Sequence, residues 1–365
     1  MTLDSNRKDQ HVDLAEKQYQ PADLSDFGKM RFVHHSMPNL KVADISLQTE
    51  MAGMSLAAPF YINGMTGGSE RTKQINADLA AVAKMTGLAM ASGSVSAALK
   101  DPSVSDSFSV IRKVNPNGQI FANIGAHHSL ENAKRAVDIL EADALQIHIN
   151  APQEMIMPEG DRDFTMWLRQ IEEISAHVGV PVIVKEVGFG MSRETIGQLI
   201  DVGVHTIDVS GKGGTNFAAI ENARRTAITY DDLENWGQST VISLLEASSH
   251  RGKAEFLASG GIKTPLDIVK ALSLGAKAAG LSGQFLHMVL SEGPEKTAET
   301  IEAWKQQITT VMAMLGKTSV ADLARTDLIF QRDILDWCDM RGIDYRQYAN
   351  RSVQSLIYYE CASDR

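Results

Sequence analysis

The sequence has only two cysteines and no long hydrophobic run, and these absences exclude several classes of protein. Cys338 and Cys361 both lie near the end of the 365-residue chain and do not form a CxxC pair, so we expect neither a disulfide framework nor a zinc site. No stretch approaches the ~18 consecutive apolar residues of a membrane-spanning helix. The first residues, MTLDSNRKDQH, are too polar for a signal peptide. We therefore expect a soluble, cytoplasmic protein with no membrane contact.

An excess of positive charge is also absent. The chain has 45 Asp and Glu against 35 Lys and Arg, a formal net charge of −10, which disfavours a nucleic-acid surface. This charge still permits a local basic pocket for a small anion. Hydrophobic residues make up 44% of the chain, with 28 glycines and 10 prolines. This composition is typical of a globular enzyme with a sizeable core.

From residue 57 onward, short apolar runs alternate with amphipathic segments, and eight such pairs can be counted. Runs that are apolar throughout are typical of parallel strands covered on both faces. Eight β/α units predict an α/β fold of the (β/α)8 TIM-barrel class. A doubly wound sheet would usually carry GxGxxG after its first strand, whereas residues 64–68 read GMTGG. The expected strands are 59–65, 87–92, 119–124, 144–150, 181–187, 206–210, 255–259 and 276–281.

Helical patterns fill the intervals between these runs. Ser129, Ser192 and Thr264 stand where helix N-caps are expected, and Pro265 suits a first helical turn. We expect one domain over residues 1–365, with the barrel at 57–316, an N-terminal extension at 1–56 and a helical C-terminal extension at 317–365. The expected helices are 71–85, 130–140, 164–178, 193–202, 236–248, 265–274 and 295–315.

The segment 256–283, FLASGGIKTPLDIVKALSLGAKAAGLSG, predicts a phosphate site. Gly260, Gly261 and Gly283 stand at the ends of two consecutive strands. Bare backbone amides beside a helix N-terminus bind phosphate well. In a TIM barrel, the loops after strands seven and eight form such a site.

Small or polar residues follow all eight strands, and Lys185 lies within the apolar run VIVKEV. A buried, unpaired ammonium is costly, so three explanations are open for this lysine. It can be a core residue paired with a neighbouring carboxylate such as Glu186, a Schiff-base lysine of an aldolase, or a cation that faces the ring of a flavin. Asn123 and the hydroxyl-rich strand ends suit the flavin better than the aldolase.

A second basic cluster, RKDQH, contains Arg7, Lys8 and His11 close to the N-terminus. On the local pattern alone it is a solvated charged tail. The functional alternative is a clamp for a diphosphate, because guanidinium groups bind phosphate oxygens in a bidentate manner.

Six motifs occur in the order found in one enzyme family. They are RKDQH, MTGG at 65–68, HINAPQE at 148–154, VIVKEVGFG at 182–190, DVSGKGGTNF at 208–217 and ASGGI at 258–262. Together they resemble type 2 isopentenyl-diphosphate isomerase over nearly the whole chain. The resemblance implies a homotetramer or larger oligomer that interconverts isopentenyl and dimethylallyl diphosphate. It also implies reduced FMN and Mg²⁺, no net redox change, and NADPH as the reductant.

The resemblance also implies a role for each matching residue. Lys185, His148 and Gln153 would be catalytic, and Glu154 would hold Mg²⁺. Without the motif, His148 could equally be a core histidine and Glu154 a solvent-facing residue. The substrate would contact Arg7, Lys8, His11, Ser94, Asn150 and Gln153. FMN would contact Met65, Thr66, Gly67, Ser94, Asn123, Lys185, Ser210, Thr215, Gly260, Gly261, Ile262, Ser282 and Gly283.

The residue at position 96 and the length of the segment 212–235 are two further features of the sequence. Many members of the family have GSQR after strand two, with an arginine for substrate phosphate, whereas this chain has Ser96 at that place. The segment 212–235 is long for a βα loop, so we expect a lid that is partly disordered without ligand.

Other functions make different demands on the sequence. An FMN-dependent hydroxyacid oxidase, the alternative, needs a His base and an Arg after strand six, and residues 210–215 contain neither. An enzyme similar to inosine-monophosphate dehydrogenase needs a cysteine in a barrel loop, but both cysteines follow the barrel. A non-catalytic flavin-storage or scaffold protein would not need RKDQH, HINAPQE and Lys185 together.

Overall fold

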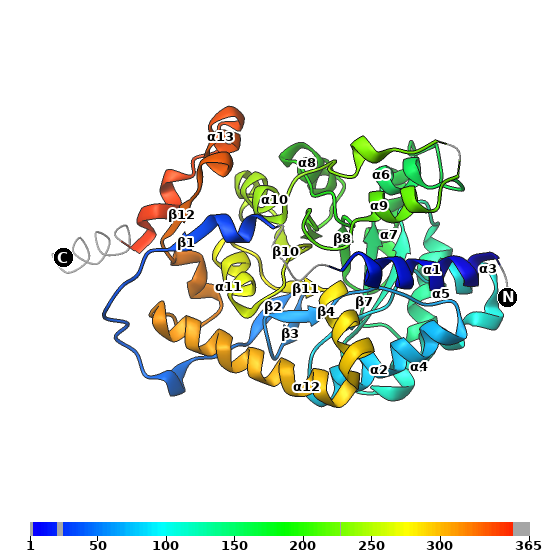
Figure 1. Ribbon diagram of the computed structural model, residues 1–365, viewed down its shortest axis with the longest axis horizontal. Helices are drawn as coiled ribbons and strands as arrows, with labels where there is room; N and C mark the ends of the chain where they lie inside the picture. Colours follow the sequence, from blue (N-terminus) through cyan, green and yellow to red (C-terminus); the bar gives the residue numbers. More distant parts are fainter. Residues whose placement is uncertain (1–2, 20–24, 227, 353–365) are drawn as a thin grey trace.

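Eight parallel strands form a closed barrel, as the sequence predicts (Figure 1). The computed structural model describes residues 3–19, 25–226 and 228–352. Each strand pairs with the next along the chain, and β11 closes the ring against β4. Most strands are shorter than predicted, because the flanking residues leave the hydrogen-bonded ladder. The strands are β4 (Phe60–Ile62), β5 (Met90–Ala91), β6 (Ile120–Gly125), β7 (Ala144–His148), β8 (Val182–Lys185), β9 (Thr206–Asp208), β10 (Glu255–Ser259) and β11 (Ala279–Leu281).

Helices surround the barrel, and their first turns follow the capping signals of the sequence. The Ser129, Ser192 and Thr264 side chains accept hydrogen bonds from the third residue beyond each, as expected for N-caps. The last helix begins earlier than predicted, at Gly283, and kinks at Gly293 before Pro294. The main helices are α2 (Glu70–Thr86), α4 (Asp106–Val114), α5 (Leu130–Leu140), α7 (Trp167–His177), α8 (Arg193–Asp201), α10 (Thr240–Ala247), α11 (Pro265–Ser273) and α12 (Gly283–Met314).

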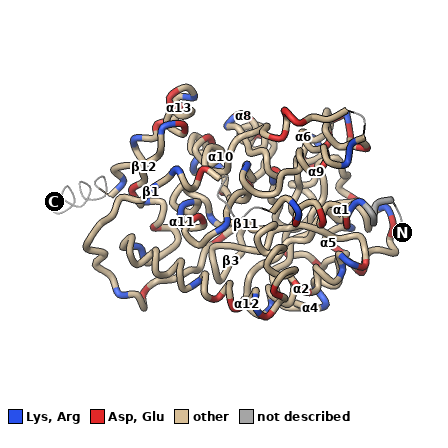
Figure 2. Tube along the Cα trace, in the orientation of Figure 1, with Lys and Arg blue, Asp and Glu red and all other residues tan. Residues whose placement is uncertain are grey.

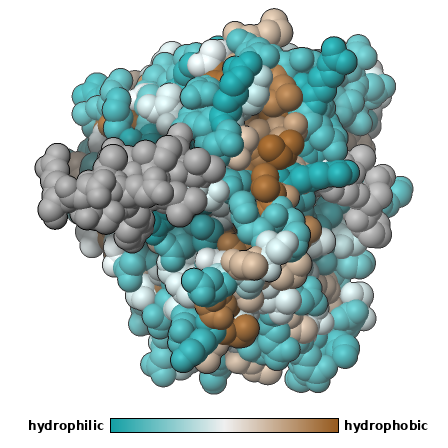
Figure 3. All heavy atoms as spheres, turned by 90° about the vertical axis from the view of Figure 1, so that its left-hand side faces the viewer, coloured by the Kyte–Doolittle hydropathy of each residue, from teal (hydrophilic) through white to brown (hydrophobic). Residues whose placement is uncertain are grey.

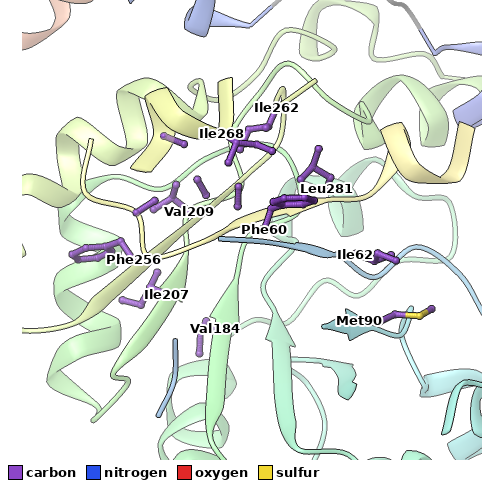
Figure 4. Close-up of a cluster of buried hydrophobic side chains, with 14 of the residues drawn as sticks. Phe60, Ile62, Met90, Val184, Ile207, Val209, Phe256, Ile262, Ile268 and Leu281 are labelled. Atoms are coloured by element: carbon purple, nitrogen blue, oxygen red, sulfur yellow. The ribbon is translucent and has the colours of Figure 1, made fainter. Parts of the chain in front are cut away.

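Side chains along the barrel strands point alternately to two buried clusters, one outside the barrel and one inside it. Phe60 and Ile62 join the large cluster between strands and helices (Figure 4). Tyr61, between them, belongs to a smaller cluster with Phe121 and Leu257. The hairpin formed by β2 (Thr49–Met51) and β3 (Met54–Leu56) adds side chains to this smaller cluster. Apolar packing therefore fills one end of the barrel interior, and the polar carboxyl ends of the strands face the other end.

The two extensions meet beside the barrel. Antiparallel pairing joins β1 (Met30–Phe32) in the N-terminal extension to β12 (Leu328–Phe330) in the C-terminal one, which also contains α13 (Arg332–Arg341). The C-terminal extension is therefore not purely helical. On this side of the molecule, apolar side chains lie among hydrophilic ones (Figure 3), and Ile329 and Met340 are exposed. Cys338 is buried and free, whereas Cys361 lies outside the described residues.

Helix α1 (Leu3–Lys17) contains the RKDQH cluster and contacts α2, α9 (Phe217–Ala223) and α12. It carries both signs of charge, as does the rest of the surface (Figure 2). The cluster therefore lies on a packed helix and not in a solvated tail. None of the described helices is long and apolar enough to cross a membrane. Two further short helices follow strands, α3 (Ser96–Lys100) and α6 (Ala151–Ile156).

Candidate active site

A cavity of about 1150 Å³ lies at the carboxyl ends of the strands. Residues at or just after each of the eight barrel strands line it, and residues of α1 line another part of its wall. TIM-barrel enzymes place their chemistry at this end. Nearly all the predicted site residues line the cavity: Arg7, Lys8, His11, Met65, Ser94, Asn123, His148, Asn150, Gln153, Glu154, Lys185, Ser210, Thr215, Gly260, Gly261, Ile262, Ser282 and Gly283.

Thr66 and Gly67 are the two predicted residues that do not line the cavity. The Thr66 carbonyl accepts a hydrogen bond from the Gly93 amide, and Thr66 is 2% exposed. Gly67 packs against Phe108, whose ring would lie 2.1 Å from an added Cβ. Neither residue forms part of the cavity wall, so their expected contact with FMN stays a prediction.

Backbone groups form one end of the cavity, at the predicted phosphate site. Helix α12 begins at Gly283, so the amides of its first turn have no acceptor within the helix. Gly260 and Gly261 have φ angles of 85° and 72°, which L-residues rarely adopt. A Cβ on Gly260 would lie 1.9 Å from the Gly211 carbonyl oxygen. The loops therefore form a backbone cradle with a helix N-terminus, which suits a phosphate group.

Lys185 is buried at the end of β8 and lines the cavity. Its Nζ atom donates a 2.6 Å hydrogen bond to the backbone carbonyl of Glu186, not to the carboxylate. Burial lowers the pKa of Lys185, while the negative charges of Asp208 and Glu186 oppose the shift. The lysine therefore does not hydrogen-bond to the Glu186 side chain, and the negative charge that most favours its charged form is that of Asp208 on β9.

The Glu186 carboxylate instead accepts hydrogen bonds from three consecutive backbone amides. The donors are Val187, Gly188 and Phe189, at 2.7, 2.9 and 2.6 Å. Burial nevertheless raises its pKa to about 7. This carboxyl group shapes the turn after β8.

The wall beneath α1 contains a carboxylate that sequence reasoning missed. Glu221 on α9 is fully buried, and its Oε1 accepts a 2.9 Å hydrogen bond from Gln153 Nε2. His11 Nε2 lies 3.2 Å from the same oxygen, and Arg224 pairs with the other. Burial raises the pKa of Glu221, but the nearby His11, the hydrogen bond from Gln153 and the charge of Arg224 outweigh this and bring it to about 2. An ionised carboxylate therefore orients two predicted site residues.

Glu221 was missed because we predicted a loop over 212–235. The segment contains α9 and a 3-10 turn, Asp231–Leu233, so it holds more regular structure than a plain βα loop, and the expectation of a lid that is partly disordered without ligand stays a prediction. The spacing of Phe217, Ala218 and Glu221 is the signal that could have placed the carboxylate on the buried face of a helix.

Glu154 lies on α6 and is 8% exposed. Its two carboxylate oxygens accept one hydrogen bond each, from Asn150 Nδ2 at 2.9 Å and the Asp161 amide at 2.8 Å. Within residues 3–19, 25–226 and 228–352, no three His, Cys, Asp or Glu side chains are placed to hold a metal ion. A Mg²⁺ ion at Glu154 would therefore need oxygens from a bound phosphate and water, as Mg²⁺ commonly does.

The place of the missing arginine is occupied by a hydroxyl–histidine chain. Ser96 Oγ lies 2.9 Å from Ser94 Oγ and 2.7 Å from His128 Nε2. Lys100, at the end of the same helix, lines the cavity together with His127. A cation is thus available one helical turn after Ser96, and the sequence alone did not single it out.

Known proteins resemble this chain in sequence over almost its whole length. An isopentenyl-diphosphate delta-isomerase from Latilactobacillus sakei is 54% identical over 342 residues, 94% of this chain and 98% of the relative. One from Staphylococcus haemolyticus is 50% identical over 338 residues, 93% and 97% of the two chains. This chain belongs to the isopentenyl-diphosphate delta-isomerases. Members of this family are enzymes that shift a carbon–carbon double bond.

A family model links the isomerase to flavin proteins, and solved structures share its fold. The family described as FMN-dependent dehydrogenase matches residues 127–330. A mandelate oxidase structure aligns with a TM-score of 0.63 at 17% identity, covering 88% of this chain and 91% of that one. The flavin-binding domain of baker's yeast flavocytochrome b2 aligns with a TM-score of 0.62 at 19% identity, covering 88% and 78%. At these identities the two structures show a shared fold alone.

Proposed function

We propose that this isomerase interconverts isopentenyl and dimethylallyl diphosphate with FMN in the barrel mouth. The observation that carries the proposal is one cavity with two cationic or amide-rich ends. Gly260, Gly261 and the start of α12 form one end, and Arg7 and Lys8 on α1 line another part. The first suits the phosphate of a cofactor and the second the diphosphate of a substrate.

The residues present fit FMN. A Cβ on Gly260 would strike the Gly211 backbone, and a Cβ on Gly283 would lie 3.2 Å from Thr215 Oγ1, so both loops keep their amides bare of side chains. Lys185 would face the negatively charged edge of the ring, and Asn123 and Ser210 would contact the cofactor. When bound in its reduced form, FMN supplies an electron-rich ring and an acidic proton at the reacting alkene.

The side chains around the substrate would exclude water and hold protons in place. Protonation of an unactivated alkene needs a dry site with an acid and a nearby acceptor. Gln153 is held by Glu221 and by Asn150, whose Nδ2 lies 3.2 Å from Gln153 Oε1. His148 lines the same cavity. Binding energy from the remote diphosphate would orient the alkene between these groups.

Mg²⁺ and the reductant belong to the same proposal. Glu154 would hold Mg²⁺ against the diphosphate, and NADPH would reduce FMN before turnover. We also propose a single-domain protomer that assembles into a homotetramer or larger, with the exposed side of Ile329 and Met340 as one candidate contact.

The deciding experiment incubates the protein with reduced FMN, Mg²⁺ and isopentenyl diphosphate under anaerobic conditions. We expect the dimethylallyl product, and its absence would refute the proposed reaction. A parallel aerobic sample with 2-hydroxy acids and oxidised FMN tests the hydroxyacid-oxidase alternative. Residues 210–215 lack the histidine and arginine which that reaction needs, so we expect no oxidation.

A further inference from the structure

Five polar side chains form a continuous chain of hydrogen bonds across the inside of the barrel. Asn63 Nδ2 lies 3.3 Å from Asp208 Oδ2, and Gln146 Nε2 lies 3.1 Å from Asn63 Oδ1. Asn123 Nδ2 lies 3.0 Å from Gln146 Oε1, and its Oδ1 lies 2.7 Å from His148 Nδ1. The first four side chains of this chain, Asp208 to Asn123, are at most 6% exposed. The chain therefore links β9 to the cavity-lining end of β7 without solvent.

The direction of this chain is fixed at the end remote from His148. The backbone amide of Gly64, which can only donate, lies 3.0 Å from one amide atom of Asn63, so that atom is the oxygen. The NH₂ group of Asn63 then faces Asp208. Asp208 also accepts from Ser259 Oγ and the Ser210 amide, so it serves as the acceptor at this end.

The donor and acceptor ends of the next two amide side chains, Gln146 and Asn123, are then fixed in turn. Asn63 Oδ1 accepts, so Gln146 donates with its NH₂ and turns its oxygen to Asn123. Asn123 must then donate to Gln146 and turn its own oxygen to His148. We propose that this relay from Gly64 and Asp208 holds His148 as the Nδ1–H tautomer, which leaves a lone pair on Nε2. Asp208, Asn63 and Gln146 are therefore positioning residues.

The surroundings keep the ring neutral as well as oriented. Burial lowers the pKa of His148 well below its usual value, and the positive charge of Lys185 adds to the effect. His127, His128 and Lys8 face the ring from other elements and act in the same direction. A neutral Nδ1–H imidazole offers Nε2 as a proton acceptor. The tautomer itself does not depend on the proposed function. The use of Nε2 as a proton acceptor for substrate rests on the proposed function.

His128 is predicted to be the opposite tautomer, which provides an internal comparison. Asn132 Oδ1 accepts from Arg135 Nη1 at 3.3 Å, so its NH₂ faces His128 Nδ1, also at 3.3 Å. That nitrogen is then the acceptor, and Nε2–H donates to Ser96 Oγ. His128 and His148 thus carry their protons on different ring nitrogens.

Nitrogen-15 NMR of histidine-labelled, FMN-loaded protein tests the relay, because protonated and bare ring nitrogens resonate far apart. His148 is assigned by its absence from the spectrum of a His148→Gln variant. We expect a protonated Nδ1 and a bare Nε2 in the wild type. A wild-type His148 with its proton on Nε2 would overturn the proposal, whatever any variant shows.

Two substitutions at one position separate the relay from mere packing. Gln146→Met keeps a similar volume but removes both hydrogen-bonding ends, so the His148 signals should shift towards a mixture of tautomers. Gln146→Glu keeps an oxygen towards Asn123, and its protonated form also donates to Asn63, so the tautomer should be retained. Equal spectra for both variants would contradict the relay.

The matched control is Asn132→Ala, which should change the His128 signals and leave those of His148 in place. Isomerase assays on the same samples keep the two proposals distinct. If no sample converts isopentenyl diphosphate but the tautomers follow the pattern, the proposed function fails and the relay stands. If wild type and Gln146→Glu are active and Gln146→Met has lost activity, both stand.

Discussion

Glu186 makes the stability of the protein depend on pH in a direction opposite to that of most carboxylates. Its side chain is 5% exposed, and burial raises its pKa from 4.5 to about 7. The folded protein therefore retains this proton up to about pH 7, whereas the unfolded chain loses it near pH 4.5. Stability from this group is fully present below pH 4.5 and is lost as the pH rises through 7.

The perturbation is Glu186→Gln, which removes the titration but keeps an oxygen for the three backbone amides. The gap between the two pKa values corresponds to roughly 3 kcal/mol. We expect the free energy of unfolding of the variant, relative to wild type, to rise by about that amount between pH 4.5 and pH 8. The stability of the variant relative to the wild type should therefore increase as the pH rises.

Chemical denaturation of both proteins at pH 4.5, 6 and 8, with equal FMN content, measures this difference. Glu70→Gln is the control, because the Glu70 side chain is 91% exposed and should show no such trend. A difference between wild type and Glu186→Gln that is the same at all three pH values would refute the reasoning. A trend of opposite sign would mean that the three amides and Lys185 outweigh burial.

Three further substitutions test the site. Lys185→Ala removes a buried cation. Because hydrogen bonds to charged groups contribute about 1.5–3 kcal/mol, FMN affinity in a fluorescence titration should fall at least roughly tenfold. Unchanged affinity would remove Lys185 from the flavin site. Glu154→Gln should raise the Mg²⁺ concentration for half-maximal activity, and an unaltered metal response would leave Glu154 a structural residue. Glu221→Gln removes the negative charge beside Gln153 and His11, so kcat/KM should fall by about 10- to 100-fold, on the order of 1.5–3 kcal/mol. Full activity would show that Gln153 and His11 do not need an ionised carboxylate beside them.

The barrel was predictable because its elements are specified locally. The strand of residues 255–259 matches the prediction, because a short, mostly apolar run that ends at Gly260 is typical of a buried strand. The helix at 130–140 also matches, because Ser129 caps it and its apolar face recurs every three to four residues. Local signals of this kind do not depend on the rest of the chain.

The parts that sequence reasoning missed depend on contacts far apart along the chain. Helix α1 is polar, and its position comes from pairs such as Asp9 with Ser69 and Asp13 with Arg71. Glu221 becomes significant only because α9 brings it under His11. Lys185 was predicted at the site, but no sequence pattern reveals that it bonds to a backbone carbonyl.

The pairing of β1 with β12 has a consequence for the order in which the protein is made. The barrel ring is complete in sequence once β11 has been synthesised, at Leu281. One wall of the cavity, however, needs Asp333, which contacts Lys29, and Trp337 on α13. A ribosome therefore releases a chain able to close its barrel well before it releases the residues that finish the site. The wall of the cavity is complete only when the first and last parts of the chain have paired through β1 and β12.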